Sequence, residues 1–241
     1  MTSPWYIALA AAAAFHTAAH SEDHPPPGPI HLTQVVVTHP DLAVALQDLK
    51  TSLFRARTPL AFDNGMSANH CAEYSNLVLT SAPQESVNNA SIKAEYLVCD
   101  AVRFIASVPF TADPTLPRTR TALRAQALFE RLDLRSFPSS LYNRTDDRAH
   151  TLKTLLASGK VTLTGSTVQV DTGDQFFALQ VVAEVRRPAT KGAAKPRPVE
   201  WIVWVTDERK DGNYRSYSTL IVHPPSPSSA GLYTGAVYPR P

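Results

Sequence analysis

The chain has 241 residues, 44% of them hydrophobic, and a formal net charge of +2 at neutral pH. This hydrophobic share is ordinary for a globular protein. So small a net charge gives no global electrostatic reason to expect nucleic acid or a membrane surface as a partner. The sequence contains neither a P-loop nor a dinucleotide-binding fingerprint. We therefore predict no nucleic-acid partner and no cofactor.

Residues 1–19 have the layout of a secretory signal peptide. An apolar run over 5–14 is followed by Thr17-Ala18-Ala19, small residues that suit a cleavage site, and then by a proline-rich leader over 20–31. One feature departs from the pattern, because no Lys or Arg precedes the apolar run. The alternative is an alanine-rich amphipathic or disordered tail. We expect a periplasmic or secreted protein without an integral membrane segment in the mature chain.

Residues 32–108 indicate an N-terminal α+β lobe. The apolar residues of 32–38 predict a strand. Leucines at helical spacing predict a helix over 40–55. The stretch 58–69 has few periodic apolar residues and contains an Asp-Asn-Gly sequence, so we expect a loop there.

The only two cysteines, Cys71 and Cys99, close the end of this lobe. The runs 71–80 and 91–100 are rich in strand formers, and the second alternates between apolar and polar residues. An antiparallel hairpin would place Cys71 opposite Cys99 or Asp100, which predicts a disulfide in an oxidising compartment. The alternative is a pair of reduced, buried cysteines that do not meet.

Prolines over 109–119 indicate a linker, and residues 120–223 then form a C-terminal lobe. Its expected helices cover 120–132 and 146–158, and its expected strands cover 161–163, 168–170, 175–186, 199–206 and 214–222. Residues 224–241 are expected to be an irregular tail. The predicted class is α+β, with helices packed on one face of one or two antiparallel sheets. A helix followed by such a meander also occurs in cystatin-like and NTF2-like folds, an analogy of topology alone.

No residues are predicted to be catalytic. His70 precedes Cys71 directly, but neighbours on a strand point to opposite faces, so they are poorly placed to act together. The G-x-S-x-G sequence of many serine hydrolases is absent. Histidines and an aspartate gather in the leader, but a flexible leader is a poor place for a preorganised metal site. No metal site is predicted.

A basic loop between two long strands is the sharpest local feature. Its residues are Arg186, Arg187, Lys191, Lys195 and Arg197, with no acid before Glu200. One interpretation is a protruding loop that binds an acidic protein surface, a glycan or a lipid head group. The other is a solvated hairpin loop whose charges aid solubility.

These features predict an exported, non-catalytic binding protein that contacts another protein. An inhibitor, an immunity-type factor or an envelope-assembly component would fit. The alternative is an extracytoplasmic hydrolase whose site is assembled from dispersed acidic residues, because carboxylate pairs cannot be recognised from sequence alone.

Overall fold

A computed structural model describes residues 32–113, 118–156, 160–188 and 198–239, and the chain from residue 31 onward forms one compact unit. Its helices are α1 (Pro40–Gln47), α2 (Leu49–Phe54), α3 (Cys71–Leu77), α4 (Val87–Lys93), α5 (Leu97–Ala106), α6 (Arg118–Arg131) and α7 (Leu152–Leu155). The strands are β1 (Thr33–Val37), β2 (Leu60–Ala61), β3 (Ser67–Ala68), β4 (Phe110–Asp113), β5 (Leu132–Asp133), β6 (Lys160–Thr164), β7 (Thr167–Asp171), β8 (Gln175–Arg186), β9 (Glu200–Arg209), β10 (Arg215–His223) and β11 (Tyr233–Tyr238). The predicted signal peptide and leader lie outside the described residues.

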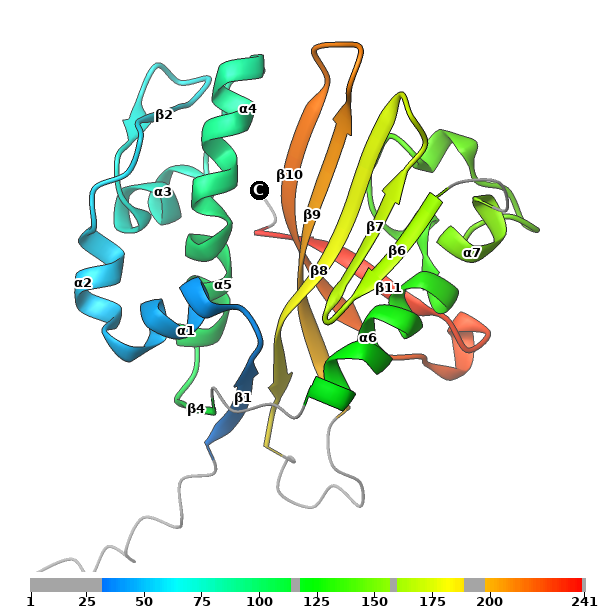
Figure 1. Cartoon of the computed structure of the whole chain (residues 1–241). Coiled ribbons are helices and arrows are strands. Elements are labelled where there is room, and N and C mark those ends of the chain that lie inside the picture. Colours follow the sequence, from blue (N-terminus) through cyan, green and yellow to red (C-terminus); the bar gives the residue numbers. More distant parts are fainter. Residues whose placement is uncertain (1–31, 114–117, 157–159, 189–197, 240–241) are drawn as a thin grey trace, which may run out of the picture. The chain divides into compact units, whose positions relative to one another are not determined.

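One mixed sheet runs through the molecule in the order β4-β1-β8-β9-β10-β11-β5 (Figure 1). The long strands β8, β9 and β10 pair in antiparallel fashion, whereas β1 with β4 and β11 with β5 are parallel pairs. Strand β7 pairs with the first half of β8 and β1 with its last part, so both lie along the same edge of β8. The sheet therefore joins the segments on either side of the predicted linker.

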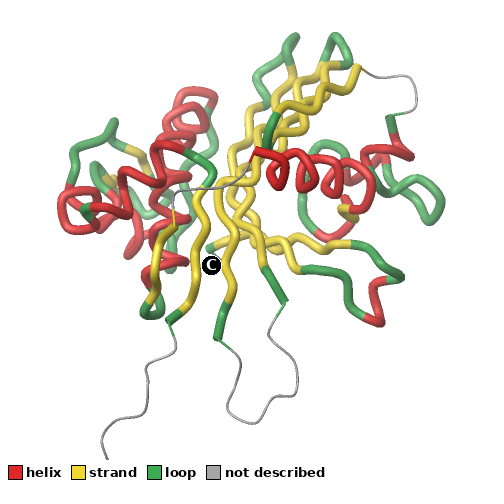
Figure 2. The backbone as a smooth tube through the Cα atoms, turned by 60° about the horizontal axis from the view of Figure 1, so that its bottom comes forward, coloured by secondary structure: helices red, strands yellow, loops and turns green. Residues whose placement is uncertain are grey.

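Helices cover both faces of this sheet. Along β9, Trp201, Val203 and Val205 belong to a core that also contains residues of α6 and α7. Ile202, between them, belongs to the core formed with α1, α3 and α5. Figures 1 and 2 show the two groups of helices on opposite sides of the strands. The α+β class is confirmed, but the expectation of helices on one face was wrong, because the central strands are apolar on both faces.

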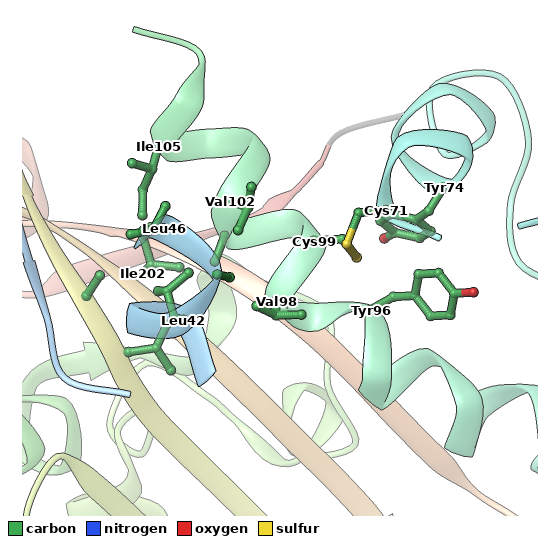
Figure 3. Packing of buried hydrophobic residues seen from close by; sticks show 14 of the residues in the cluster. Leu42, Leu46, Cys71, Tyr74, Tyr96, Val98, Cys99, Val102, Ile105 and Ile202 are labelled. Carbon is green, nitrogen blue, oxygen red and sulfur yellow. A yellow bond between two sulfur atoms is a disulfide. The ribbon is translucent and has the colours of Figure 1, made fainter. Parts of the chain in front are cut away.

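The first core shows how the sequence builds one of these layers. Val98, Val102 and Ile105 recur at helical spacing on α5 and face Leu42 and Leu46 of α1 (Figure 3). All five side chains are at most 9% exposed. Complete burial of an aliphatic side chain of this size contributes about 1.5–3 kcal/mol. This packing fixes α5, and with it the second cysteine, against the sheet.

The predicted cysteine hairpin was wrong, because both of its strands are helical. His70 begins α3, and its ring Nδ1 accepts the backbone N–H of Glu73 at 3.2 Å. Ser86 begins α4 in the same way, with its hydroxyl accepting the N–H of Asn89 at 3.1 Å. These caps satisfy N–H groups that a helix start leaves without partners. A short 3-10 turn, Ala94–Tyr96, then leads into α5.

Three further predictions were wrong in detail. The helix expected over 146–158 starts at Leu152, because Thr151 caps it, and ends at Leu155, while residues 157 and 158 lie outside the described residues. Asp146 instead accepts two backbone N–H groups within a turn, both at 2.7 Å. The linker contains β4, and the tail contains β11. The structure confirms the helix expected over 120–132 and the strands expected over 32–38, 161–163, 168–170, 175–186, 199–206 and 214–222. The helix expected over 40–55 breaks at Asp48 into α1 and α2.

Candidate functional site

The base of the basic loop lies against the body of the protein. Arg187, just after β8, places its Nε 3.1 Å from an oxygen of Glu200, and its guanidinium lies 5.1 Å from the centre of the Phe104 ring. Arg186 ends β8 and is exposed. The other predicted loop residues, Lys191, Lys195 and Arg197, lie outside the described residues. Glu200 and Phe104 were not predicted as parts of a site.

A cavity of about 420 Å³ opens beside this contact, between α5 and the ends of β9, β10 and β11. We call it the Glu200 pocket. Its lining is mainly apolar, with four ionisable residues, and consists of Leu79, Arg103, Phe104, Glu200, Ile221, His223, Ala236, Val237, Tyr238 and Pro239. An apolar wall with a few polar groups is typical of ligand-binding cavities of this size.

The register of the sheet brings the ionisable residues of the Glu200 pocket together. Glu200 begins β9 and His223 ends β10, and Val222 pairs with Trp201, so the two lie beside each other on neighbouring strands. Glu200 Oε1 lies 3.1 Å from His223 Nδ1. Hydrogen bonding from His223 and from Arg187 holds the pKa of Glu200 below its ordinary value, although partial burial opposes this. Glu200 therefore stays ionised and holds the Arg187 guanidinium and the His223 ring at the rim.

A histidine oriented by a carboxylate can serve as a general base. Among the described residues that line the Glu200 pocket, however, there is no serine, threonine or cysteine for it to activate. Burial raises the pKa of the Tyr238 hydroxyl, so this phenol also stays protonated near neutral pH. The geometry therefore suits the binding of an apolar group with a charged neighbour more directly than covalent catalysis.

The predicted disulfide between Cys71 and Cys99 is confirmed. Their Cα atoms are 5.1 Å apart and both residues are at most 1% exposed (Figure 3). The bond joins the first residue of α3 to α5. Both sulfurs are oxidised and buried, so the pairing of Cys71 with His70 as catalytic groups is not supported.

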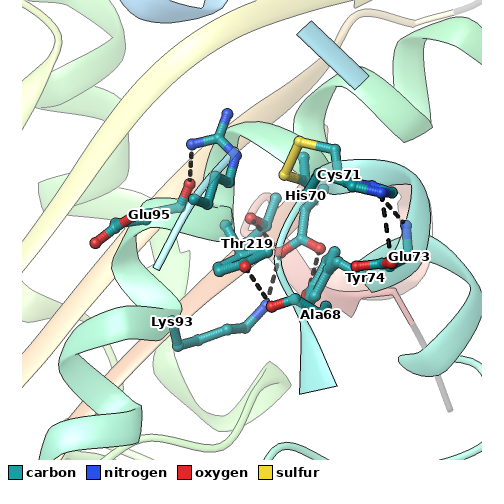
Figure 4. The surroundings of a disulfide bond; sticks show 12 residues. Ala68, His70, Cys71, Glu73, Tyr74, Lys93, Glu95 and Thr219 are labelled. Atoms are coloured by element: carbon teal, nitrogen blue, oxygen red, sulfur yellow. Dashed lines mark hydrogen bonds and ion pairs between the residues drawn. A yellow bond between two sulfur atoms is a disulfide. The ribbon is translucent and has the colours of Figure 1, made fainter. Parts of the chain in front are cut away.

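A buried ionic cluster lies next to the disulfide and was missed by the sequence analysis. Asp100 of α5 is 0% exposed and accepts hydrogen bonds from the hydroxyls of Tyr74, at 2.7 Å, and Thr219, at 3.0 Å. Lys93 Nζ lies 3.3 Å from the same carboxylate and also contacts the Tyr74 hydroxyl (Figure 4). Burial raises the pKa of Asp100, and Lys93 opposes this. The sequence does contain a signal for this cluster, because Asp100 is an aspartate inside the apolar run of residues 97–105.

A second buried carboxylate, that of Asp207 of β9, lies on the face of the sheet opposite Asp100. It accepts the backbone N–H and the hydroxyl of Ser140, at 2.7 and 2.6 Å, and the side-chain amide of Gln175 at 3.1 Å. Its oxygens thereby hold the loop after β5 to the sheet. The two most buried aspartates are thus engaged by neighbouring side chains on opposite faces, and do not form a pair.

Within the described part of the chain, no group of three or more His, Cys, Asp or Glu residues could hold a metal ion. The histidines of the leader lie outside that part. None of the described helices combines the length and the apolar character that crossing a membrane requires. Comparisons with protein-family models, curated proteins and solved structures find no match to this chain.

Proposed function

We propose that this protein is an exported, non-catalytic binding protein, periplasmic or secreted, that contacts another protein through the Glu200 pocket and the basic loop. An inhibitor, an immunity-type factor or an envelope-assembly component would act in this way. The observation that carries the proposal is the composition of the pocket, in which an apolar wall is bordered by Arg103, His223 and the ion pair of Arg187 with Glu200.

The lining defines the chemistry of the partner. The apolar wall would receive one aliphatic or aromatic side chain, the kind of anchor that dominates protein interfaces. Arg187 borders the pocket through its ion pair with Glu200, and the loop beyond Arg187 carries three more basic residues and no acid. An acidic surface around the anchor would complement this charge and speed association. The partner we propose therefore presents an apolar side chain flanked by Asp or Glu.

A photo-crosslinking amino acid tests this proposal. Leu79 lines the pocket and is 47% exposed, so benzoylphenylalanine at this position would lie against a bound partner. In the native host, we expect irradiation to give one discrete adduct with a second protein. The matched control carries the same amino acid at Leu123, which is 70% exposed on α6, on the other face of the sheet.

The control position should give no such adduct, and His223→Ala should lower the yield from position 79. The absence of an adduct from position 79, or the same adducts from both positions, would contradict the proposal.

The second candidate is an extracytoplasmic hydrolase, and the observation in its favour is the contact of His223 with Glu200. In this case His223 would activate water for attack on a substrate in the Glu200 pocket. To distinguish the two functions, the wild type and His223→Gln are each incubated with the captured partner, and cleavage of the partner is measured. Cleavage of the partner by the wild type that is lost in this variant would favour the hydrolase.

A further inference from the structure

A second cavity, of about 620 Å³, lies between α4 and the start of β10. One wall comes from the segment before α4 and from α4 itself, including Gln84, Glu85 and Lys93. The other comes from the β9–β10 turn and the first residues of β10, including Tyr214, Arg215 and Tyr217. We call it the α4–β10 cavity. Its lining differs from that of the Glu200 pocket, because polar residues predominate in it.

The charges around the α4–β10 cavity cancel. Its charged lining residues are Glu85, Lys93 and Arg215. Lys93 is already paired with the buried Asp100 behind it, at 3.3 Å. Arg215 donates a hydrogen bond to the Ser91 hydroxyl at 3.1 Å, and Glu85 brings the remaining negative charge. An anion would find no surplus of positive charge here, so a neutral ligand fits better.

Tyr217 supplies aromatic surface with its hydroxyl already engaged. The Tyr217 hydroxyl donates to Glu208 on the α4 side of the sheet. The Tyr214 hydroxyl donates to Asp207, at 3.2 Å, on the opposite face, so only Tyr217 turns its ring toward the cavity. Burial and the hydrogen bond to Glu208 raise the pKa of Tyr217 to about 12, so this hydroxyl stays protonated near neutral pH. The contact with Glu208 restrains the Tyr217 ring, which stays partly exposed. A restrained aromatic ring is a contact surface with little entropy to lose on binding.

We propose that the α4–β10 cavity binds a neutral saccharide. A sugar ring presents a C–H face that packs on an aromatic ring, and hydroxyls that both donate and accept hydrogen bonds. The Tyr217 ring matches the first property, and carboxylate, amide and guanidinium groups of Glu85, Gln84 and Arg215 match the second. Behind the cavity, Lys93 of α4 and Thr219 of β10 both contact Asp100 of α5. The site is independent of the Glu200 pocket.

Isothermal titration calorimetry of the oxidised protein with maltotriose, cellotriose and chitotriose tests this inference, with sodium sulfate as the anionic comparison. We expect saturable binding of at least one trisaccharide and none of sulfate. Tyr217→Ala should weaken that binding at least about tenfold, since loss of an aromatic contact worth about 1.4 kcal/mol has this effect. The matched control, Tyr142→Ala, removes an exposed tyrosine outside the cavity and should leave the affinity unchanged.

Arg215→Ala provides a second variant in case Tyr217→Ala does not fold, and it should also weaken binding. The inference is overturned if none of the three trisaccharides binds, if sulfate alone binds, or if folded Tyr217→Ala and Arg215→Ala both bind as the wild type does.

Discussion

Replacing Cys71 and Cys99 together by alanine should lower the free energy of unfolding by about 3.5 kcal/mol, as expected for a disulfide whose cysteines are 28 residues apart. The bond restricts the conformations of the unfolded chain by closing a loop between the two cysteines. In the folded state it joins α3 to α5, whose residues form part of the first core. Urea denaturation of the oxidised wild type and of the alanine variant measures the difference. Alanine is chosen because both positions are buried, and serine would add a hydroxyl without a partner.

Reduction supplies the control for this prediction. A thiol reductant should destabilise the wild type by a similar amount and leave the alanine variant unchanged. A loss below about 1 kcal/mol, well under the usual range for a native disulfide, would show that the bond does not brace the fold as we describe.

Asp100→Ala should lower the free energy of unfolding by about 3–5 kcal/mol, the usual effect of removing one member of a buried ion pair. The substitution leaves the Lys93 ammonium without its carboxylate and deprives the hydroxyls of Tyr74 and Thr219 of their acceptor. The matched control is Asp63→Ala, which removes an exposed carboxylate and should change the free energy by less than about 0.5 kcal/mol. Equal effects of the two substitutions would contradict the role given to the cluster.

The same residue predicts a pH dependence. Burial raises the pKa of Asp100 above 3.8, so folding favours its protonated form. The linked contribution to stability is complete below pH 3.8 and decreases as the pH rises through the pKa of the folded state. Asp100→Asn cannot titrate and should therefore lose less stability than the wild type between about pH 4 and pH 7. Urea denaturation across this range checks the sign.

The long strands were predictable because each is a continuous run of strand formers bounded by turn residues. Gln175–Arg186 matches its predicted range at both ends. Their apolar content on both faces was also visible in the sequence, and it indicates helices on two sides. The α+β class followed from these patterns, whereas the cystatin-like or NTF2-like topology stays a prediction.

The disulfide was predicted from a geometry that the protein does not use. Alternation over residues 91–100 is short enough to suit either a strand or a helix, and the helix caps at His70 and Ser86 decide between them. The two cysteines still meet, because α3 and α5 pack side by side in the first core. The sequence therefore indicated that Cys71 and Cys99 form a disulfide, but not that two helices carry them.

The Glu200 pocket could not be predicted, because its residues come from parts of the chain that only the tertiary structure brings together. Arg103 lies on α5, whereas Glu200 and His223 become neighbours through the register of β9 and β10. The sequence indicated only the basic loop beside it. The strand β11, which completes the pocket, lies in a segment expected to be irregular.

The proposal of an exported, oxidised binding protein is tested most directly by the intact mass of the natively expressed protein, measured with and without reduction before alkylation. We predict the loss of residues 1–19 and two thiols that react only after reduction. A protein that keeps these residues, with both cysteines alkylated without reduction, would contradict export and the oxidised state of Cys71 and Cys99.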